Sequence, residues 1–131
     1  MGAGLQLQIV TPESVTFDES IDHVVLPSWK GELAVYPRHA PLLSRMGFGE
    51  LRAAVGGQMQ RFFVDGGIVE VRGERVTVLS DRAIPAAKLR GDQLDEEEAA
   101  LRGRSTTDQD ELESIRVGLQ KVAVQRKIAS N

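Results

Sequence analysis

The sequence predicts an all-β N-terminal β-sandwich of about ten short strands, followed by a C-terminal two-helix hairpin. Apolar and polar residues alternate over short runs in the first two thirds of the chain, and glycine-rich turns separate the runs. All five prolines and all six aromatic residues lie before residue 90. Beyond that point apolar residues recur every three or four positions, which indicates helix. We therefore expect a sandwich domain at 1–88 and a helical hairpin at 89–131.

The predicted strands follow one another with only short turns between them. Residues 5–10 alternate apolar and polar side chains, as in a strand with one solvent-facing side. Similar runs occur at 14–17, 21–26, 32–36, 48–55, 58–64, 68–72 and 75–80. Gly56 and Gly57 fit a two-residue hairpin turn, which would place Leu51 opposite Phe62. Many short antiparallel strands of this kind form a sandwich or a flattened barrel.

Two helices are predicted after the sandwich. The first begins at Gln93 and ends at Arg102, with acidic residues in its first turn and a basic one in its last, as the helix dipole favours. After a break at 103–107, Asp108 is a candidate N-cap for a second helix that ends near Ala129. Its narrow apolar stripe consists of Leu112, Ile115, Leu119 and Val122, with Ala129 one turn further on. Such a stripe is typical of a coiled-coil seam.

Composition excludes several classes of function. The formal net charge of −3 does not suggest nucleic acid binding, and the absence of cysteine excludes disulfides, thiol catalysis and cysteine-based zinc sites. No apolar run approaches the roughly 20 residues of a membrane span. The N-terminus has neither a signal-peptide nor a transit-peptide pattern, so we expect a cytoplasmic product.

The chain offers little for catalysis. His23 and His39 are its only histidines, they lie in unrelated contexts, and no phosphate-binding Gly-x-x-x-x-Gly-Lys-Ser/Thr loop is present. The acidic residues at 92–98 lack the spacing of a calcium loop and are typical of a solvated helix start. We expect no catalytic residue, no metal site and no enzymatic activity of the isolated chain.

One segment combines a strand with a rigid, charged turn. Residues 31–43 read Gly-Glu-Leu-Ala-Val-Tyr-Pro-Arg-His-Ala-Pro-Leu-Leu. Pro37 and Pro41 restrict the backbone on both sides of Arg38 and His39, so the strand should end near Tyr36. The segment is either an ordinary strand-to-loop corner or a surface contact.

This segment, with three others, resembles the epsilon subunit of the bacterial F-type ATP synthase. The others are the opening strand and corner at 5–12, Gly-Gly-Ile-Val-Glu-Val at 66–71 and Val-Thr-Val-Leu-Ser-Asp at 76–81. The resemblance implies a non-catalytic central-stalk subunit of a proton-translocating synthase, which couples rotation of the membrane ring to catalysis. It also implies a peripheral location on the cytoplasmic face of the bacterial inner membrane, without insertion into the bilayer.

The resemblance further implies partners and contact residues. Glu32 would face the rotor ring, while Arg38 and His39 would contact the gamma subunit. In an extended hairpin, the gamma subunit would also contact Leu112, Ile115, Leu119 and Val122. Acidic loops of the beta subunit, in the alpha/beta hexamer, would meet Arg116, Lys121, Arg126 and Lys127, and the hairpin could thereby inhibit ATP hydrolysis. The alternative is a free-standing protein-binding sandwich with a helical dimerisation tag.

A nucleotide site is the last implication of the resemblance. Some members of the family bind ATP through Ile/Leu-Asp-x-x-Arg-Ala at the start of the first helix, and residues 94–99 correspond to this motif. Glu98 stands at the arginine position, where an anion would repel the phosphates. Asp95 remains a candidate nucleotide contact, but the charge of Glu98 argues against ATP as a cofactor.

Overall fold

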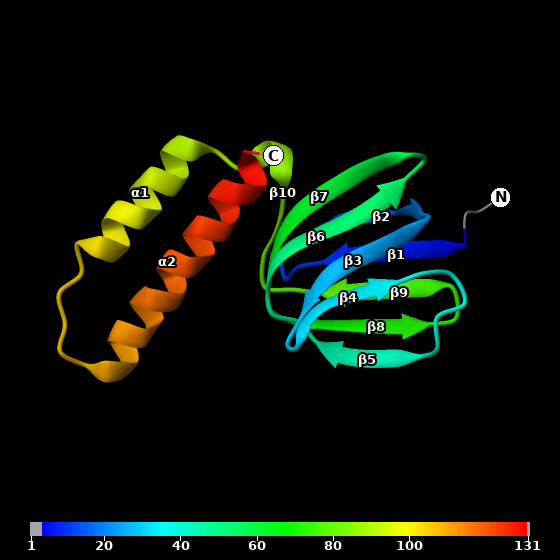
Figure 1. Cartoon of the computed structure of the whole chain (residues 1–131), viewed down its shortest axis with the longest axis horizontal. Helices are drawn as coiled ribbons and strands as arrows, with labels where there is room; N and C mark the ends of the chain where they lie inside the picture. The colour runs from blue at the N-terminus through cyan, green and yellow to red at the C-terminus, as the bar shows by residue number, and fades with distance from the viewer. Residues whose placement is uncertain (1–3, 131) are drawn as a thin grey trace. The chain divides into compact units, whose positions relative to one another are not determined.

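Figure 1 shows a computed structural model of the chain, which describes residues 4–130. The chain forms two compact units, the first ending at Ala86 and the second beginning at Ala87. The first unit holds ten strands in two sheets, and the second holds two helices that pack together. The predicted sandwich followed by a helical hairpin is therefore confirmed.

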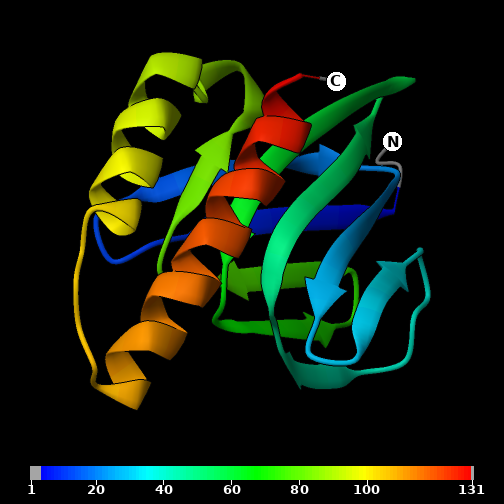
Figure 2. The ribbon, with the colours of Figure 1, turned by 60° about the vertical axis from the view of Figure 1, so that its left-hand side comes forward.

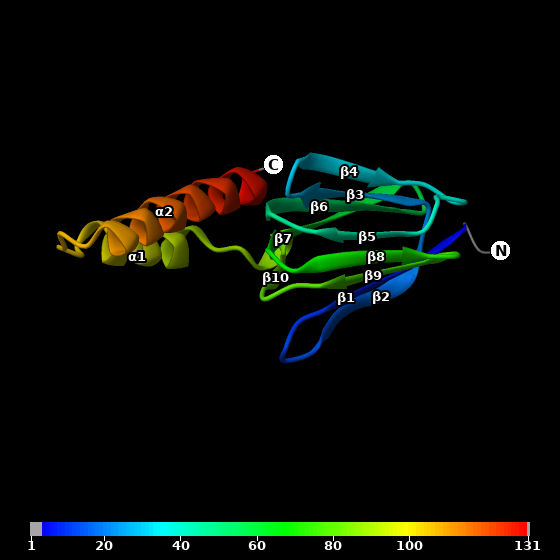
Figure 3. The ribbon, with the colours of Figure 1, turned by 90° about the horizontal axis from the view of Figure 1, so that it is seen from below.

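The sandwich consists of two five-stranded sheets, seen edge-on as two layers in Figure 3. Sheet one has the order β2 (Val15–Ile21), β1 (Leu5–Val10), β9 (Arg75–Leu79), β8 (Ile68–Arg72) and β5 (Leu42–Arg45). Sheet two has the order β10 (Ala83–Pro85), β7 (Gln58–Asp65), β6 (Phe48–Val55), β3 (His23–Ser28) and β4 (Gly31–Val35). Neighbouring strands are antiparallel except β1 and β9, which run parallel.

The hydrophobic core lies between the sheets and follows the alternation of the sequence. In β1 every second side chain is buried, beginning at Leu5, as the pattern predicts. Leu51 faces Phe62 across the β6–β7 hairpin, which confirms the predicted register, and Phe17 meets the Phe62 ring edge-on at 5.4 Å between centroids. Each fully buried side chain of this size contributes about 2 kcal/mol, so the inward rows account for much of the stability of the sandwich.

Strand boundaries differ from prediction mainly at the short strands. Neither β5 nor β10 belongs to a predicted run, and β2 extends to Ile21 instead of ending at residue 17. Strands of three or four residues are too short to show a period, and their assignment depends on hydrogen bonding to β8 and β7. Pro85 is tolerated in β10 because this strand forms an edge of its sheet.

The second unit begins with a short 3-10 helix, Ala86–Lys88, whose first residue still belongs to the first unit. It continues with α1 (Gly91–Arg102) and α2 (Gln109–Ala129), which Figure 2 shows lying side by side. Asp108 caps α2 as predicted, since its carboxylate accepts hydrogen bonds from the amides of Asp110 and Glu111. Gly118 leaves room for Leu101, because a Cβ there would lie 3.1 Å from both its δ-carbons.

The apolar stripe of α2 differs from prediction at its end. Val122 is buried as expected, and burial continues at Gln125 and Ile128, whereas Ala129 is exposed. The predicted extension through Ala129 is therefore wrong. Burial of the small Ala129 side chain would remove little apolar surface from water. Burial of Ile128, one position earlier, removes far more and is therefore favoured.

Candidate functional site

Glu32 belongs to a ladder of charges on the outer face of sheet two. Arg52 donates hydrogen bonds from Nη1 to Glu32, at 3.2 Å, and to Glu50, at 3.1 Å. Arg61 in turn donates from Nε to Glu50 at 2.6 Å. Partial burial opposes the charge on Arg52, but the hydrogen bonds to Glu32 and Glu50 outweigh it and raise the pKa of the guanidinium. The Glu32 carboxylate is thus exposed but oriented by a cation on β6, which is separated from β4 by β3.

The turn between β3 and β4 carries the most exposed aromatic side chain of the described chain. Trp29 is 64% exposed, and Lys30 Nζ lies 4.8 Å from the centre of its ring. The turn is well defined, because Ser28 Oγ donates to the carbonyl of Gly31 and accepts from the amide of Lys30. The amide of Trp29 also donates to the carbonyl of Arg45. Sequence reasoning missed Trp29, although an aromatic residue in a polar turn could have indicated it.

Arg38 and His39 lie at the other end of β4 from Glu32. The strand ends at Val35, as predicted, and its five residues span roughly 16 Å. Arg38 adopts a left-handed backbone conformation with φ of 67°, and His39 Nδ1 lies 2.6 Å from the carbonyl oxygen of Ala40. The predicted ring contact and the predicted gamma contacts of the sandwich are therefore at opposite ends of one strand, suited to different partners.

The outer face of sheet one carries an exposed apolar row that sequence reasoning did not assemble. Val15 pairs with Val10, Val10 with Leu79, and Leu79 with Ile68, so these side chains from four strands lie next to one another. Three of them are exposed, with Leu79 at 44%. A shallow hollow beside the row is lined by Val10, Thr11, Pro12, Leu79, Ser80 and Asp81. A contiguous exposed apolar row is typical of a protein-binding surface.

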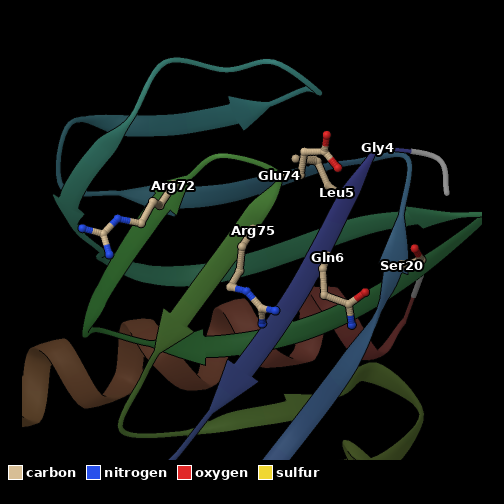
Figure 4. Close-up of a pocket in the computed structure, with 7 residues that line it drawn as sticks. All are labelled: Gly4, Leu5, Gln6, Ser20, Arg72, Glu74 and Arg75. Carbon is tan, nitrogen blue, oxygen red and sulfur yellow. The ribbon is translucent and has the colours of Figure 1, made fainter.

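The opposite end of the same face is polar and basic, as Figure 4 shows. Arg72 pairs across strands with Arg75, and Arg75 pairs with Gln6, so two guanidinium groups come from adjacent strands. Glu74 and Ser20 complete the polar lining of the hollow at this place. The face therefore offers a partner an apolar row at one end and two guanidinium groups at the other. The cross-strand row between them consists of Glu70, Thr77, Gln8 and Asp18.

Within the hairpin, Arg126 joins the two helices. It contacts Asp95 Oδ1 through Nη1 at 2.8 Å and donates from Nη2 to Glu98 Oε1 at 2.6 Å. Glu98 also accepts from Arg102 Nε at 3.0 Å. Hydrogen bonds from Arg102 and then Arg126 hold the pKa of Glu98 below its ordinary value, and those to Asp95 and Glu98 raise the pKa of Arg126. The candidate nucleotide contact Asp95 is thus already paired with a cation.

The remaining predicted contact residues of α2 differ in solvent exposure and in their ion pairs. Arg116 pairs with Glu113 on its own helix, which holds the pKa of that carboxyl low. Lys121 is half-buried and Lys127 is exposed. The stripe changes from exposed to buried along the helix, in the order Leu112, Ile115, Leu119 and Val122. In this arrangement Leu112 is the member of the stripe most accessible to another protein.

The fold does not place His23 and His39 in one site. His23 stacks on Tyr36, with ring centroids 4.8 Å apart, whereas His39 lies in the loop after β4. Among residues 4–130 no group of three or more histidines and carboxylates is placed to hold a metal ion. In the same range no helix combines the length and apolarity needed to cross a bilayer.

The fold is thus a two-sheet β-sandwich with an exposed apolar row, followed by an ion-paired helical hairpin. Residues 4–86 match the family described as ATP synthase, Delta/Epsilon chain, beta-sandwich domain. The ATP synthase epsilon chain of Desulforamulus reducens is 46% identical over 94 residues, 72% of this chain and 67% of that protein. The chain belongs to the ATP synthase epsilon chain family, and it is a non-catalytic subunit of the synthase.

Other comparisons extend the similarity to the hairpin. The epsilon chain of Desulfitobacterium hafniense strain Y51 is 34% identical over 129 residues, 98% of this chain and 95% of that protein, a span that includes both helices. The solved Euglena gracilis mitochondrial ATP synthase, described as OSCP/F1/c-ring, contains a chain with TM-score 0.83 and 16% identity, covering 97% of this chain and 82% of its own length. This likeness supports the fold of the whole chain.

Proposed function

We propose that this epsilon chain is a rotor subunit of the central stalk in a bacterial proton-translocating ATP synthase. The sandwich holds the chain on the gamma subunit, one end of the sandwich faces the membrane rotor ring, and the chain turns with the shaft. The observation that carries this proposal is the exposed apolar row on sheet one, formed by Val10, Val15, Ile68 and Leu79. The proposed location of the chain is the cytoplasmic face of the inner membrane, where the other subunits of the complex hold it.

The gamma subunit is the proposed occupant of the outer face of sheet one. An apolar row at one end of the face and two arginines at the other favour a partner surface that is apolar opposite the row and acidic opposite Arg72 and Arg75. Arg38 and His39 extend this surface, because their loop leads into β5, the edge strand on which Leu43 is exposed. In support of such an assembly, a Tetrahymena thermophila structure described as central stalk/c-ring contains a similar fold, with TM-score 0.74 at 13% identity.

The rotor ring is the proposed partner of the β3–β4 turn, where Glu32 and Trp29 lie close in sequence. Tryptophan is enriched among residues that dominate binding energy. We expect Trp29→Ala to weaken binding of the full chain to the purified ring by about tenfold or more. Since Trp29 is the only tryptophan, its emission should shift to the blue on binding, with the Trp29→Ala chain as baseline. Met59→Ala, at an exposed site on β7, is the control, and equal effects of both variants would argue against a ring contact at this turn.

We further propose that the hairpin regulates ATP hydrolysis. When extended along gamma, it packs Leu112, Ile115, Leu119 and Val122 on that subunit and presents Arg116, Lys121, Arg126 and Lys127 to acidic loops of the beta subunit. The narrow stripe supports this proposal, because a helix that buries little area can exchange one packing for another of similar free energy.

Truncation tests the regulatory proposal. We expect the ATPase rate of a reconstituted catalytic complex to rise several-fold when the chain ends after Lys88, because that chain keeps the sandwich and lacks both helices. The full chain in the same complex is the control. Equal rates would mean that the hairpin does not inhibit hydrolysis, while binding to gamma would still test the rotor role separately.

A further inference from the structure

The residues at the family's nucleotide position do not fit a nucleotide. Glu98 replaces the arginine expected to meet the phosphates, and its charge is already balanced by Arg102 and Arg126. Asp95, the other candidate contact, is paired with Arg126 as well. An entering triphosphate would have to displace a cation from two carboxylates and then lie against both anions.

We infer that Arg126 is an internal latch that closes the hairpin without a nucleotide. One guanidinium bridges two carboxylates on the other helix, each through a different nitrogen. The planar fork of arginine suits this geometry, whereas the single ammonium of lysine would serve it less well. The inference rests on the proposed function in one respect: Arg126 must leave the latch before it can contact the beta subunit.

The ion pairs of Arg126 contribute to the closed state of the hairpin because α1 makes few apolar contacts with α2. Leu94 is the only buried residue of that helix, and Leu101, which packs on Gly118, is half-buried. Ion pairs therefore form a large share of the contact between α1 and α2. All three charged partners remain accessible to solvent, so dissolved salt should screen the latch and favour opening.

The absence of cysteine makes a direct test possible. Cysteines introduced at Ala100 and Ala123, both exposed, would carry spin labels on α1 and α2 of the full chain. The distribution of distances between the labels then reports the closed and open populations. The measurement needs no other subunit, so failure of the rotor or inhibitory proposals would leave its result unchanged.

We expect Arg126→Gln to lower the ratio of closed to open hairpin by about two- to fivefold, with a smaller effect for Arg126→Lys. High salt should open the wild-type hairpin and have little further effect on Arg126→Gln. Arg116→Gln is the matched control, because Arg116 pairs within its own helix. Adding Arg126→Gln to a chain that already carries Asp95→Asn and Glu98→Gln should change nothing more.

Millimolar ATP with Mg²⁺ should leave the closed population unchanged. Two outcomes would overturn the inference. One is a rise of the closed population with ATP, which would mean that a nucleotide closes this hairpin. The other is an equal response of Arg126→Gln and Arg116→Gln, which would mean that packing alone holds the helices together.

Discussion

Replacing Leu79 by Asp is expected to reduce the affinity of the full chain for the gamma subunit by about a hundredfold, or nearly 3 kcal/mol. Leu79 lies at the centre of the apolar row, between Ile68 on β8 and Val10 on β1. A carboxylate there would be desolvated by a partner that covers the row, with no cation from this chain placed beside it in the row. Isothermal titration calorimetry with the cognate gamma subunit measures the effect.

Met59→Asp is the matched control for this prediction. Met59 is 47% exposed, close to the 44% of Leu79, but it lies on β7 of the other sheet. We expect this variant to bind gamma with an affinity within a factor of about three of the wild type, since surface substitutions away from an interface have small effects. Thermal unfolding of both variants would verify that the sandwich is intact. Equal affinities of the two variants would place the gamma contact elsewhere than on sheet one.

Replacing Gly67 by Ala is expected to lower the free energy of unfolding of the sandwich by about 3 kcal/mol or more. Gly67 has φ of +105°, and a Cβ at this position would overlap the carbonyl oxygen of Leu79. Its own carbonyl also accepts a hydrogen bond from the amide of Met46. The turn cannot move away from Leu79 without disturbing that hydrogen bond. The backbone strain at positive φ and the overlap of the Cβ with the Leu79 carbonyl should therefore both lower the free energy of unfolding.

Chemical denaturation of the full chain, followed by the circular dichroism of its strands, measures this loss. Gly57→Ala separates backbone strain from overlap, because Gly57 has φ of +85° and a Cβ added there would have nothing within 4 Å. We expect Gly57→Ala to lower the free energy of unfolding by only about 1 kcal/mol. If both variants lost the same stability, the β7–β8 turn would have to relax freely, contrary to the close contact in the structure.

The fold could be predicted from the sequence where a pattern was long enough to repeat. The alternation in β1 and the glycine pair between β6 and β7 led to the correct fold class and to the pairing of Leu51 with Phe62. The cap at Asp108 was equally local. The strands β5 and β10 were missed because three or four residues carry no period, and only their partners in the sheet define them.

The candidate site could be predicted only in part. Glu32, Arg38 and His39 were found through the resemblance of one continuous segment, and their contacts with partners remain proposals. Trp29 was overlooked because a single aromatic residue in a turn forms no motif. The apolar row was invisible in the sequence, since each of its strands contributes one member and the row forms only when the register of sheet one is known.

The sequence by itself determined the order of a sandwich and a helical hairpin and membership in the epsilon chain family, because both depend on local periodicity and on continuous motifs. Tertiary structure alone decided which charges far apart in the sequence meet. Arg52 reaches Glu32 across 20 positions, and Arg126 reaches Glu98 across 28. Electrostatic interaction depends on distance in space and on solvent exposure, and neither quantity is fixed until strands pair and helices pack.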